Sequence, residues 1–246
     1  MKSCLIIPDC HIPYHNRSAL RLVMKVAKFY RPEVVIILGD WVDFYQVSAH
    51  LKDPSRMERF EDEVKEGNKL LRQLESYSYG ERYYIMGNHE FRLDRYLMSN
   101  APDLKPYINA DILLALRRNH WTVVPYKEHV KVGPLYVTHD IGQAGIHSTR
   151  QALRAYQDNV VIGHNHRLDY HVQGNAHGHP HVGASFGWLG DTNCIDYMHR
   201  MKAKSQWSLG FGWGHIDTKR NYVYLTPIPI VESTCCVDGR QFTVPS

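Results

Sequence analysis

The tetrapeptide Gly163-His164-Asn165-His166 places two imidazoles two positions apart, directly after an apolar run at residues 160–162. Side chains spaced by two on an extended segment point to the same side, so both rings can face one point in space. Such a pair suits a metal ion. The pair alone is a weak signal, because the chain carries 16 histidines in 246 residues. Its meaning therefore depends on the other residues that could do chemistry.

Four other apolar runs end in the same kind of polar turn. The residues concerned are Asp9 and His11 after residues 5–7, Asp40 and Asp43 after 34–38, Asn88 and His89 after 83–86, and His139 after 135–138. In open α/β sheets, binding sites form outside the carboxyl ends of the strands. We therefore expect all five turns to converge on one crevice.

Each of these residues alone has an ordinary structural explanation, since Asp can cap a helix, Asn can stabilise a turn and a lone His is commonly structural. Two aspartates, an asparagine and four histidines together would be costly to bury without cations. Oxygen and imidazole ligands without a thiolate favour Mn²⁺, Fe or Zn²⁺ over Ca²⁺ or an iron–sulfur cluster. Seven ligands suit two ions that share a bridging carboxylate, at a separation of about 3.5–4 Å.

The elements that must position these turns alternate in the first half of the chain. Apolar runs predict strands at residues 3–7, 34–38 and 83–86, and amphipathic spacing predicts helices at 17–29 and 56–74. Residues 91–119 are expected to be helical, with breaks at Pro102 and Pro106. Alternation of strand and helix predicts right-handed crossovers and a parallel sheet.

The second half of the chain has a different pattern, with short apolar runs separated by turn residues. Residues 121–126, 129–132 and 135–138 alternate with turn residues, which is typical of antiparallel hairpins. A helix at 148–157 precedes a strand at 160–162, and further strands are expected at 181–186, 207–213 and 222–225. We expect a catalytic domain at residues 1–226 and a C-terminal arm at 227–246, in which Asp238-Gly239 indicates a β-hairpin turn. The arm could pack on this chain or join two copies into a homo-oligomer.

Composition limits the class of protein. The chain has 43% hydrophobic and 22% charged residues, and no apolar run approaches the roughly 18 residues that a membrane span needs. The N-terminal apolar run is too short for a signal peptide, and five sparse cysteines without zinc-type spacing fit free thiols. These features predict a cytoplasmic protein without a membrane segment. A net charge of +4 is compatible with a polyanionic partner.

The ordered set Asp9-x-His11, Gly39-Asp40-x-x-Asp43, Gly87-Asn88-His89-Glu90, His139 and Gly163-His164-x-His166 resembles the calcineurin-like metallophosphoesterase superfamily. The resemblance implies an α/β fold, a two-sheet (αββα) sandwich. It also implies that Asp9, His11 and His166 hold one metal and that Asn88, His139 and His164 hold the other, with Asp40 bridging. Asn165 would point away. The two divalent ions are expected to be Mn²⁺, with Fe, Zn²⁺, Ni²⁺ or Mg²⁺ as alternatives.

The resemblance further implies a mechanism. A hydroxide that bridges two metals would attack phosphorus in line. His89 would assist the leaving oxygen, and Asp43 would orient its ring.

Departures from the superfamily pattern bear on the substrate. Protein phosphatases of the superfamily usually follow the second motif with Arg-Gly, whereas here Phe44 and Tyr45 follow Asp43. Arg92 could supply a phosphate contact instead. Aromatic residues such as Tyr14, Trp41 and Trp188 could stack the bases of a nucleic acid or nucleotide, although such residues at strand edges are more often packing.

Three functions remain open from the sequence. The first is a phosphodiesterase acting on DNA, RNA or a nucleotide. The second is a phosphomonoesterase of the same chemistry, acting on a protein or a small molecule. The third is a binding scaffold that kept the fold and lost catalysis, although every metal-ligand position and His89 are present in this chain.

Overall fold

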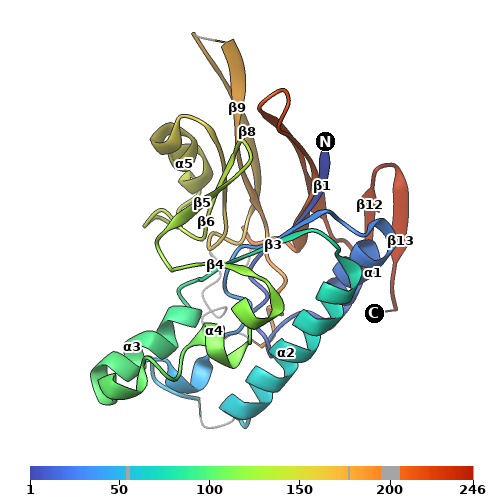
Figure 1. The fold of residues 1–246 in the computed structure, drawn as a ribbon. Coiled ribbons are helices and arrows are strands. Elements are labelled where there is room, and N and C mark those ends of the chain that lie inside the picture. Colours follow the sequence, from blue (N-terminus) through green and yellow to red (C-terminus); the bar gives the residue numbers. More distant parts are fainter. Residues whose placement is uncertain (54–55, 177, 195–205, 246) are drawn as a thin grey trace.

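The chain forms two main β-sheets that are covered on their outer faces by helices. The fold comes from a computed structural model, which describes residues 1–53, 56–176, 178–194 and 206–245. The α/β fold and the two-sheet sandwich expected from the sequence are confirmed (Figure 1).

The first sheet has six strands and is mostly parallel in its centre. In spatial order its strands are β11 (Tyr222–Pro229), β10 (Gly210–Asp217), β1 (Lys2–Ile7), β2 (Val34–Ile37), β3 (Glu81–Ile85) and β4 (Thr122–Val124). Strands β1 to β4 pair in parallel, whereas β10 pairs antiparallel with both β1 and β11. The carboxyl ends of β1, β2 and β3 therefore lie at one edge.

The second sheet has five strands. In spatial order they are β5 (His129–Val132), β6 (Leu135–Thr138), β7 (Asn159–Ile162), β9 (Gly178–Phe186) and β8 (Leu168–Asn175). Strands β6, β7 and β9 run parallel, and β5 and β8 pair antiparallel at the two edges.

Three apolar clusters account for the layers. Residues such as Ile6, Ile36 and Val137 form a core between the two sheets. On the outer face of the first sheet lie α1 (Arg17–Tyr30) and α2 (Phe60–Tyr77), and on that of the second lies α5 (Ser148–Tyr156). Because both faces of β1, β2 and β7 are covered, these strands read as unbroken apolar runs.

Short helical segments link β3 to β4. They are α3 (Glu90–Asn100), the 3₁₀ helix η2 (Pro102–Leu104), α4 (Ala110–Leu113) and the 3₁₀ helix η3 (Arg117–Asn119). The expected break at Pro102 is present, because the 3₁₀ turn starts at that residue. A further 3₁₀ helix, η1 (Tyr45–Val47), follows the second polar turn.

Several expected elements have different limits or partners. Residues 121–126 do not form a hairpin with the next strand, because β4 pairs in parallel with β3 and buries Val124 between the sheets. Helix α2 begins at Phe60 rather than at residue 56, and the strand expected at 207–213 is β10 at Gly210–Asp217. Strand β8 was not predicted; it is an edge strand whose Val172 is exposed, so it lacks a strong burial pattern.

The last residues form a hairpin that packs on this chain. Strands β12 (Thr234–Val237) and β13 (Arg240–Thr243) pair antiparallel around Asp238 and Gly239, both of which have positive φ. This is the backbone that an Asp-Gly hairpin turn requires. Phe242 is buried against α1, beside which the hairpin lies in Figure 1. Strand β11 crosses residue 226, so the division of the chain at that position stays a prediction.

Candidate metal centre

The five polar turns meet at the carboxyl ends of β1, β2, β3, β6 and β7. Asp40 lies at the centre of this cluster. Its Oδ2 atom is 3.4 Å from His139 Nε2, 3.8 Å from His89 Nε2 and 3.9 Å from His11 Nε2. All four side chains are buried. The convergence expected from the sequence is therefore present.

The candidate ligands divide into two groups that share one carboxylate. Asp9, His11, Asp40 and His166 each offer a ligand atom within 4.8 Å of the others, and so do Asp40, His139 and His164. Asn88 joins the second group, because its Oδ1 is 3.0 Å from His139 Nε2. Asp40 is thus the one residue shared by these two groups, and a two-ion site would need such a shared carboxylate.

The donor set fits cations. The Oδ2 atoms of Asp9 and Asp40 are buried and have no hydrogen-bond partner among the described residues. Two imidazole nitrogens, His11 Nε2 and His166 Nε2, face each other at 3.3 Å. Buried carboxylate oxygens without partners are costly, and cations between these atoms would satisfy them.

Burial also favours the neutral form of three of these histidines. It lowers the pKa of His11, His164 and His166 below the ordinary value. Neutral imidazole is the form that binds a metal. The same burial raises the pKa of Asp9 to about 6, which is the cost of desolvating a carboxylate.

His139 has a different environment. Burial opposes its charge, but the Asp40 carboxylate outweighs that effect and raises the pKa of His139 to about 10. Its Nδ1 donates to the backbone carbonyl of Leu38 at 2.6 Å, which leaves Nε2 directed at Asp40 and Asn88. A carbonyl partner of this kind fixes which nitrogen of a ligating His faces the metal.

His89 is not in either ligand group that contains Asp40, although it forms a third group of possible metal-binding side chains with His11 and Asp43. Its Nδ1 lies 3.0 Å from Asp43 Oδ2, and Asp43 Oδ2 is also 3.3 Å from His11 Nδ1. Burial disfavours the charged ring, yet the carboxylates of Asp40 and Asp43 offset this and raise the pKa of His89. Asp43 therefore orients the His89 ring, and Nε2 of His89 faces Asp40 Oδ2 at 3.8 Å.

Arg92 lies behind this pair rather than in the open. It is 9% exposed, and its Nη1 donates to Asp43 Oδ1 at 2.8 Å and to the Asp43 carbonyl at 2.9 Å. Its Nη2 is 3.1 Å from His89 Nε2. The guanidinium is thus engaged with both members of the pair. The substrate contact expected of Arg92 stays untested, and this geometry favours a supporting role.

Glu90 holds the polar turns together, a role that its place in the motif Gly87-Asn88-His89-Glu90 did not predict. Its buried carboxylate accepts the backbone N–H groups of Asp40, Trp41, Val42 and Gly87 at 2.8–3.3 Å, and the Tyr84 hydroxyl at 2.8 Å. One side chain therefore fixes the turns after β2 and β3 relative to each other. Its position beside His89 could have suggested a role, but its partners in three of these bonds are 48 to 50 residues away along the chain.

Two glycines make the close approach possible. A Cβ atom at Gly87 would lie 2.1 Å from Asp40 Oδ1, and one at Gly39 would lie 2.5 Å from His139 Nδ1. Gly39 also has a φ of +96°, which side chains rarely adopt. The glycines of both motifs are therefore required by space at the centre of the cluster.

The two histidines after β7 do not lie on an extended segment. His164 and His166 have φ values of 66° and 57°, in the left-handed region. The expected convergence of the two rings is present, but its cause is this tight turn rather than strand geometry. Asn165 points away as expected, and its Nδ2 donates to Ser148, Thr149 and Ser185.

The aromatic residues around the cluster are mostly packed. Trp41 and Trp188 are at most 1% exposed, and Tyr14 is 5% exposed. Trp188 stacks on His166 with ring centroids 5.1 Å apart. Arg56 lies 4.4 Å above the Tyr14 ring, on the outer side of the same cluster. The base-stacking role suggested for Trp41 is excluded by burial.

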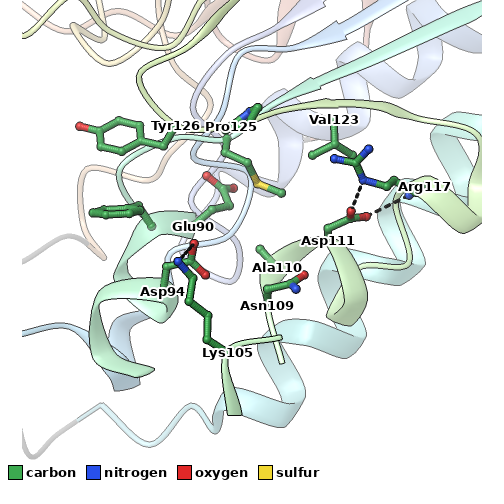
Figure 2. A pocket seen from close by; sticks show the side chains of 12 residues that line it. Glu90, Asp94, Lys105, Asn109, Ala110, Asp111, Arg117, Val123, Pro125 and Tyr126 are labelled. Atoms are coloured by element: carbon green, nitrogen blue, oxygen red, sulfur yellow. Dashed lines mark hydrogen bonds and ion pairs between the residues drawn. The ribbon is translucent and has the colours of Figure 1, made fainter. Parts of the chain in front are cut away.

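A pocket of about 410 Å³ lies beside the cluster and not over it. Figure 2 shows its walls, which come from α3, α4 and the segment around Pro125 and Tyr126. Glu90 is the residue that the pocket shares with the turns around the metal ligands. The two cations that line the pocket are already paired, since Lys105 contacts Asp94 and Arg117 contacts Asp111.

The fold and this cluster define a metallohydrolase of the αββα type, and comparison with known proteins agrees. The model of the calcineurin-like phosphoesterase family matches residues 3–196. The chain therefore belongs to the calcineurin-like phosphoesterase family, and it is a metal-dependent phosphoesterase. The match covers every candidate ligand from Asp9 to His166.

Two relatives are similar over nearly their whole length. The Gene 54 protein of Mycobacterium phage D29 is 28% identical over 262 residues, and that of Mycobacterium phage L5 is 25% identical over 260 residues. Each alignment covers 99% of this chain and 99% of the relative.

Solved structures are similar at a lower level. Vps29 of Chaetomium thermophilum is 12% identical with a TM-score of 0.49, covering 100% of this chain and 97% of that chain. Yfce, a phosphoesterase from E. coli, is 13% identical with a TM-score of 0.43, covering 92% and 98%. Similarity at this level says nothing about function.

The sequence predicts no membrane-spanning segment, and the helices of the structure can be compared with that prediction. Among the described residues, no helix is both long enough and apolar enough to cross a bilayer.

Proposed function

We propose that this phosphoesterase hydrolyses phosphodiester bonds in a nucleic acid or nucleotide. The observation that carries the proposal is the arrangement around Asp43, which holds His89 at 3.0 Å while Arg92 is withdrawn into the same network. A dianionic monoester is recognised best by a free guanidinium. In this turn, Phe44 and Tyr45 stand where protein phosphatases of the superfamily usually have Arg-Gly, and the nearby Arg92 is occupied.

The roles proposed for the ligands follow the two groups. Asp9, His11 and His166 would hold one divalent ion, and Asn88, His139 and His164 would hold the other, with Asp40 shared. We propose Mn²⁺ for both, because the ligands are oxygen and imidazole. When bound, such ions activate water near neutral pH and neutralise phosphate oxygens.

The chain's own residues supply proton transfer and orientation. We propose that His89 donates a proton from Nε2 to the leaving oxygen when substrate is bound; without substrate, an N–H group of Arg92 lies 3.1 Å from the same nitrogen. Asp43 accepts from Nδ1 of His89, which directs Nε2 toward Asp40 and the cluster. General acid assistance of this kind contributes about 10²–10⁴ in rate. A cytoplasmic location and a nucleic-acid or nucleotide substrate belong to the same proposal.

The test compares a chromogenic phosphodiester with its monoester counterpart. A chelator removes bound metal from the protein, and Mn²⁺ is then added back. Hydrolysis by the wild type is measured beside hydrolysis by His89→Asn. We expect diester turnover in the wild type and a fall of about 10²–10⁴ in the variant. The metal content should be unchanged, because His89 is outside the two ligand groups that share Asp40.

A matched control and two contrary outcomes complete the design. His120→Asn replaces an exposed histidine whose left-handed φ of 62° Asn tolerates, and it should keep full activity. Turnover of the monoester alone would move the assignment to a phosphomonoesterase. Bound metal without turnover of either ester would support a binding scaffold instead.

A further inference from the structure

A second concave surface lies between α1 and α2, outside the metal centre. It has a volume of about 800 Å³ and is lined by residues of both helices (Figure 1 shows the two helices). Its cations are Arg17, Arg21, Lys25, Lys28 and Lys69, and its one carboxylate is Glu66. We call this surface the α1–α2 groove.

The groove concentrates positive charge. Five cations and one carboxylate leave an excess of four positive charges, which equals the formal net charge of the entire chain. His15 also lines the groove, but burial lowers its pKa and keeps it neutral at pH 7. All five cations are exposed, and none forms an ion pair with the residues that the structure describes. Arg17, Lys28 and Lys69 are thus available to a ligand, whereas Arg21 and Lys25 also donate to backbone carbonyls of the C-terminal segment.

The spacing along α1 fits a linear polyanion. Arg17, Arg21, Lys25 and Lys28 follow one another at intervals of four, four and three residues, so they lie on one helix face. They span about 17 Å at a rise of 1.5 Å per residue. One strand of B-form DNA covers this length with about five nucleotides.

This arrangement is costly for the helix itself. Like charges at i,i+4 destabilise a helix. The first turn of α1 contains Arg17 and no acidic residue, which is also unfavourable next to the positive end of the helix dipole. Bound phosphates would relieve both effects.

The groove and the metal centre share one segment of the chain, because His15 and Arg17 line the groove and His11 is a candidate ligand. Asn16 caps α1 and donates its backbone N–H to the carbonyl of Leu189, and Leu189 donates to the carbonyl of Asp9. Arg17 is six residues beyond His11. A strand lying in the groove would therefore lead toward the turn that carries the candidate ligands.

From these observations we infer that the α1–α2 groove binds the phosphate backbone of a single-stranded nucleic acid. The inference deepens the proposed function, on which it rests for the fate of the bound strand. Binding itself depends on the charges of the groove and not on catalysis. Because the contacts are to phosphates, binding should be independent of base sequence and sensitive to salt.

The test measures binding of a fluorescein-labelled single-stranded oligodeoxynucleotide by anisotropy at several salt concentrations. The protein is the full chain, loaded with Mn²⁺ and carrying His89→Asn to prevent cleavage. The groove variant adds Arg17→Gln, Lys28→Gln and Lys69→Gln. Arg21 and Lys25 are left intact, because they also donate to the carbonyls of Pro245 and Thr243.

We expect the slope of log K against log salt to fall in magnitude by about 2, at about 0.7 per lost contact. If affinity near 1 M salt is unchanged, this corresponds to about a hundredfold weaker binding near 0.1 M salt. Glu66→Gln, which removes the one carboxylate of the groove, should strengthen binding.

The control removes the same charge elsewhere. Arg118→Gln, Arg150→Gln and Lys219→Gln replace three exposed cations outside the groove and should leave most of the affinity and slope intact. Equal losses in the groove variant and the control would overturn the inference, because they would show a response to net charge alone. Preference for poly-glutamate over the oligonucleotide would also overturn it.

A separate assay distinguishes the two proposals. With His89 intact, the groove variant should hydrolyse the small chromogenic diester as fast as wild type. Loss of that activity would mean that the substitutions act through the metal centre, against the inference. If wild type hydrolyses no diester but the groove variant still loses oligonucleotide affinity, the proposed function fails and the binding site stands.

Discussion

At the residue scale, three polar side chains of the cluster have a second contact that sets their orientation. His139 is held by the Leu38 carbonyl, His89 by Asp43, and Asp40 by the backbone N–H of His89 at 2.9 Å. Positioning of this kind determines which atom of each side chain faces the cluster. The network around Asp43 also includes the guanidinium of Arg92, which donates to Asp43 Oδ1 at 2.8 Å.

The position of Arg92 leads to a prediction about pH. Arg92 acts to lower the pKa of His89, so Arg92→Gln should raise that pKa. A proton donor is lost as pH rises through its pKa, so the alkaline limb of the kcat profile should move to higher pH. We also expect kcat to fall about 10–100-fold, the range for residues that support a site through another.

The pH profile of kcat distinguishes a supporting role of Arg92 from direct binding of substrate. Arg92→Lys keeps the charge, so its alkaline limb should stay close to that of wild type. If Arg92 instead binds substrate phosphate, Arg92→Gln should raise KM and leave the limb where it is.

At the element scale, the turns after β2 and β3 must approach more closely than side chains allow. Gly39 and Gly87 provide the space, and Glu90 at the start of α3 binds the N–H groups of both turns. In the turn after β7, His164 and His166 adopt left-handed backbone conformations, which make the turn tight. The strands bring the turns together, and these few residues then determine their separation.

Gly87→Ala tests this requirement. The new methyl would lie 2.1 Å from Asp40 Oδ1 and 2.5 Å from the Asp40 nitrogen, so Asp40 must move. We expect a loss of stability of about 1–3 kcal/mol, measured by urea unfolding, and less bound Mn²⁺ after dialysis. Gly145→Ala is the matched control, since nothing lies within 4 Å of its added Cβ. Equal metal content in the two variants would contradict the prediction.

At the scale of the whole molecule, the two sheets and their helices bury both the apolar core and a set of ionisable groups. The C-terminal hairpin extends the packing over α1, where Phe242 contacts Phe29 and Tyr30. The hairpin's apolar face is therefore used within this chain, and a homo-oligomer formed through it stays a prediction. The buried histidines make the stability of the fold depend on pH.

His15 allows this dependence to be measured away from the ligands. Burial lowers its pKa, so the folded state holds it neutral while the unfolded state binds a proton below about pH 6.5. Its contribution to stability is complete above that value and decreases as pH falls. Replacing it by Gln should reduce the loss of stability between about pH 7.5 and pH 5 in urea unfolding. Parallel curves for wild type and His15→Gln would refute this.

The sequence by itself determined which residues meet and in what order along the chain. Runs such as residues 34–38 predict parallel strands, and the carboxyl ends of parallel strands share an edge, so Asp9, Asp40 and Asn88 had to be neighbours. The family and the two-sheet fold follow from the same ordered motifs. Local patterns sufficed here because each motif directly follows its own strand.

Only the tertiary structure decided the features that depend on partners distant along the chain. Glu90 bonds to Asp40, 50 residues away, and Arg92 is engaged with Asp43, 49 residues away, so neither role is visible in a local pattern. The partner of β4 and the groove between α1 and α2 likewise depend on which surfaces pack together. The physical reason is that periodicity reports which face of an element is buried, whereas packing alone decides what that face is buried against.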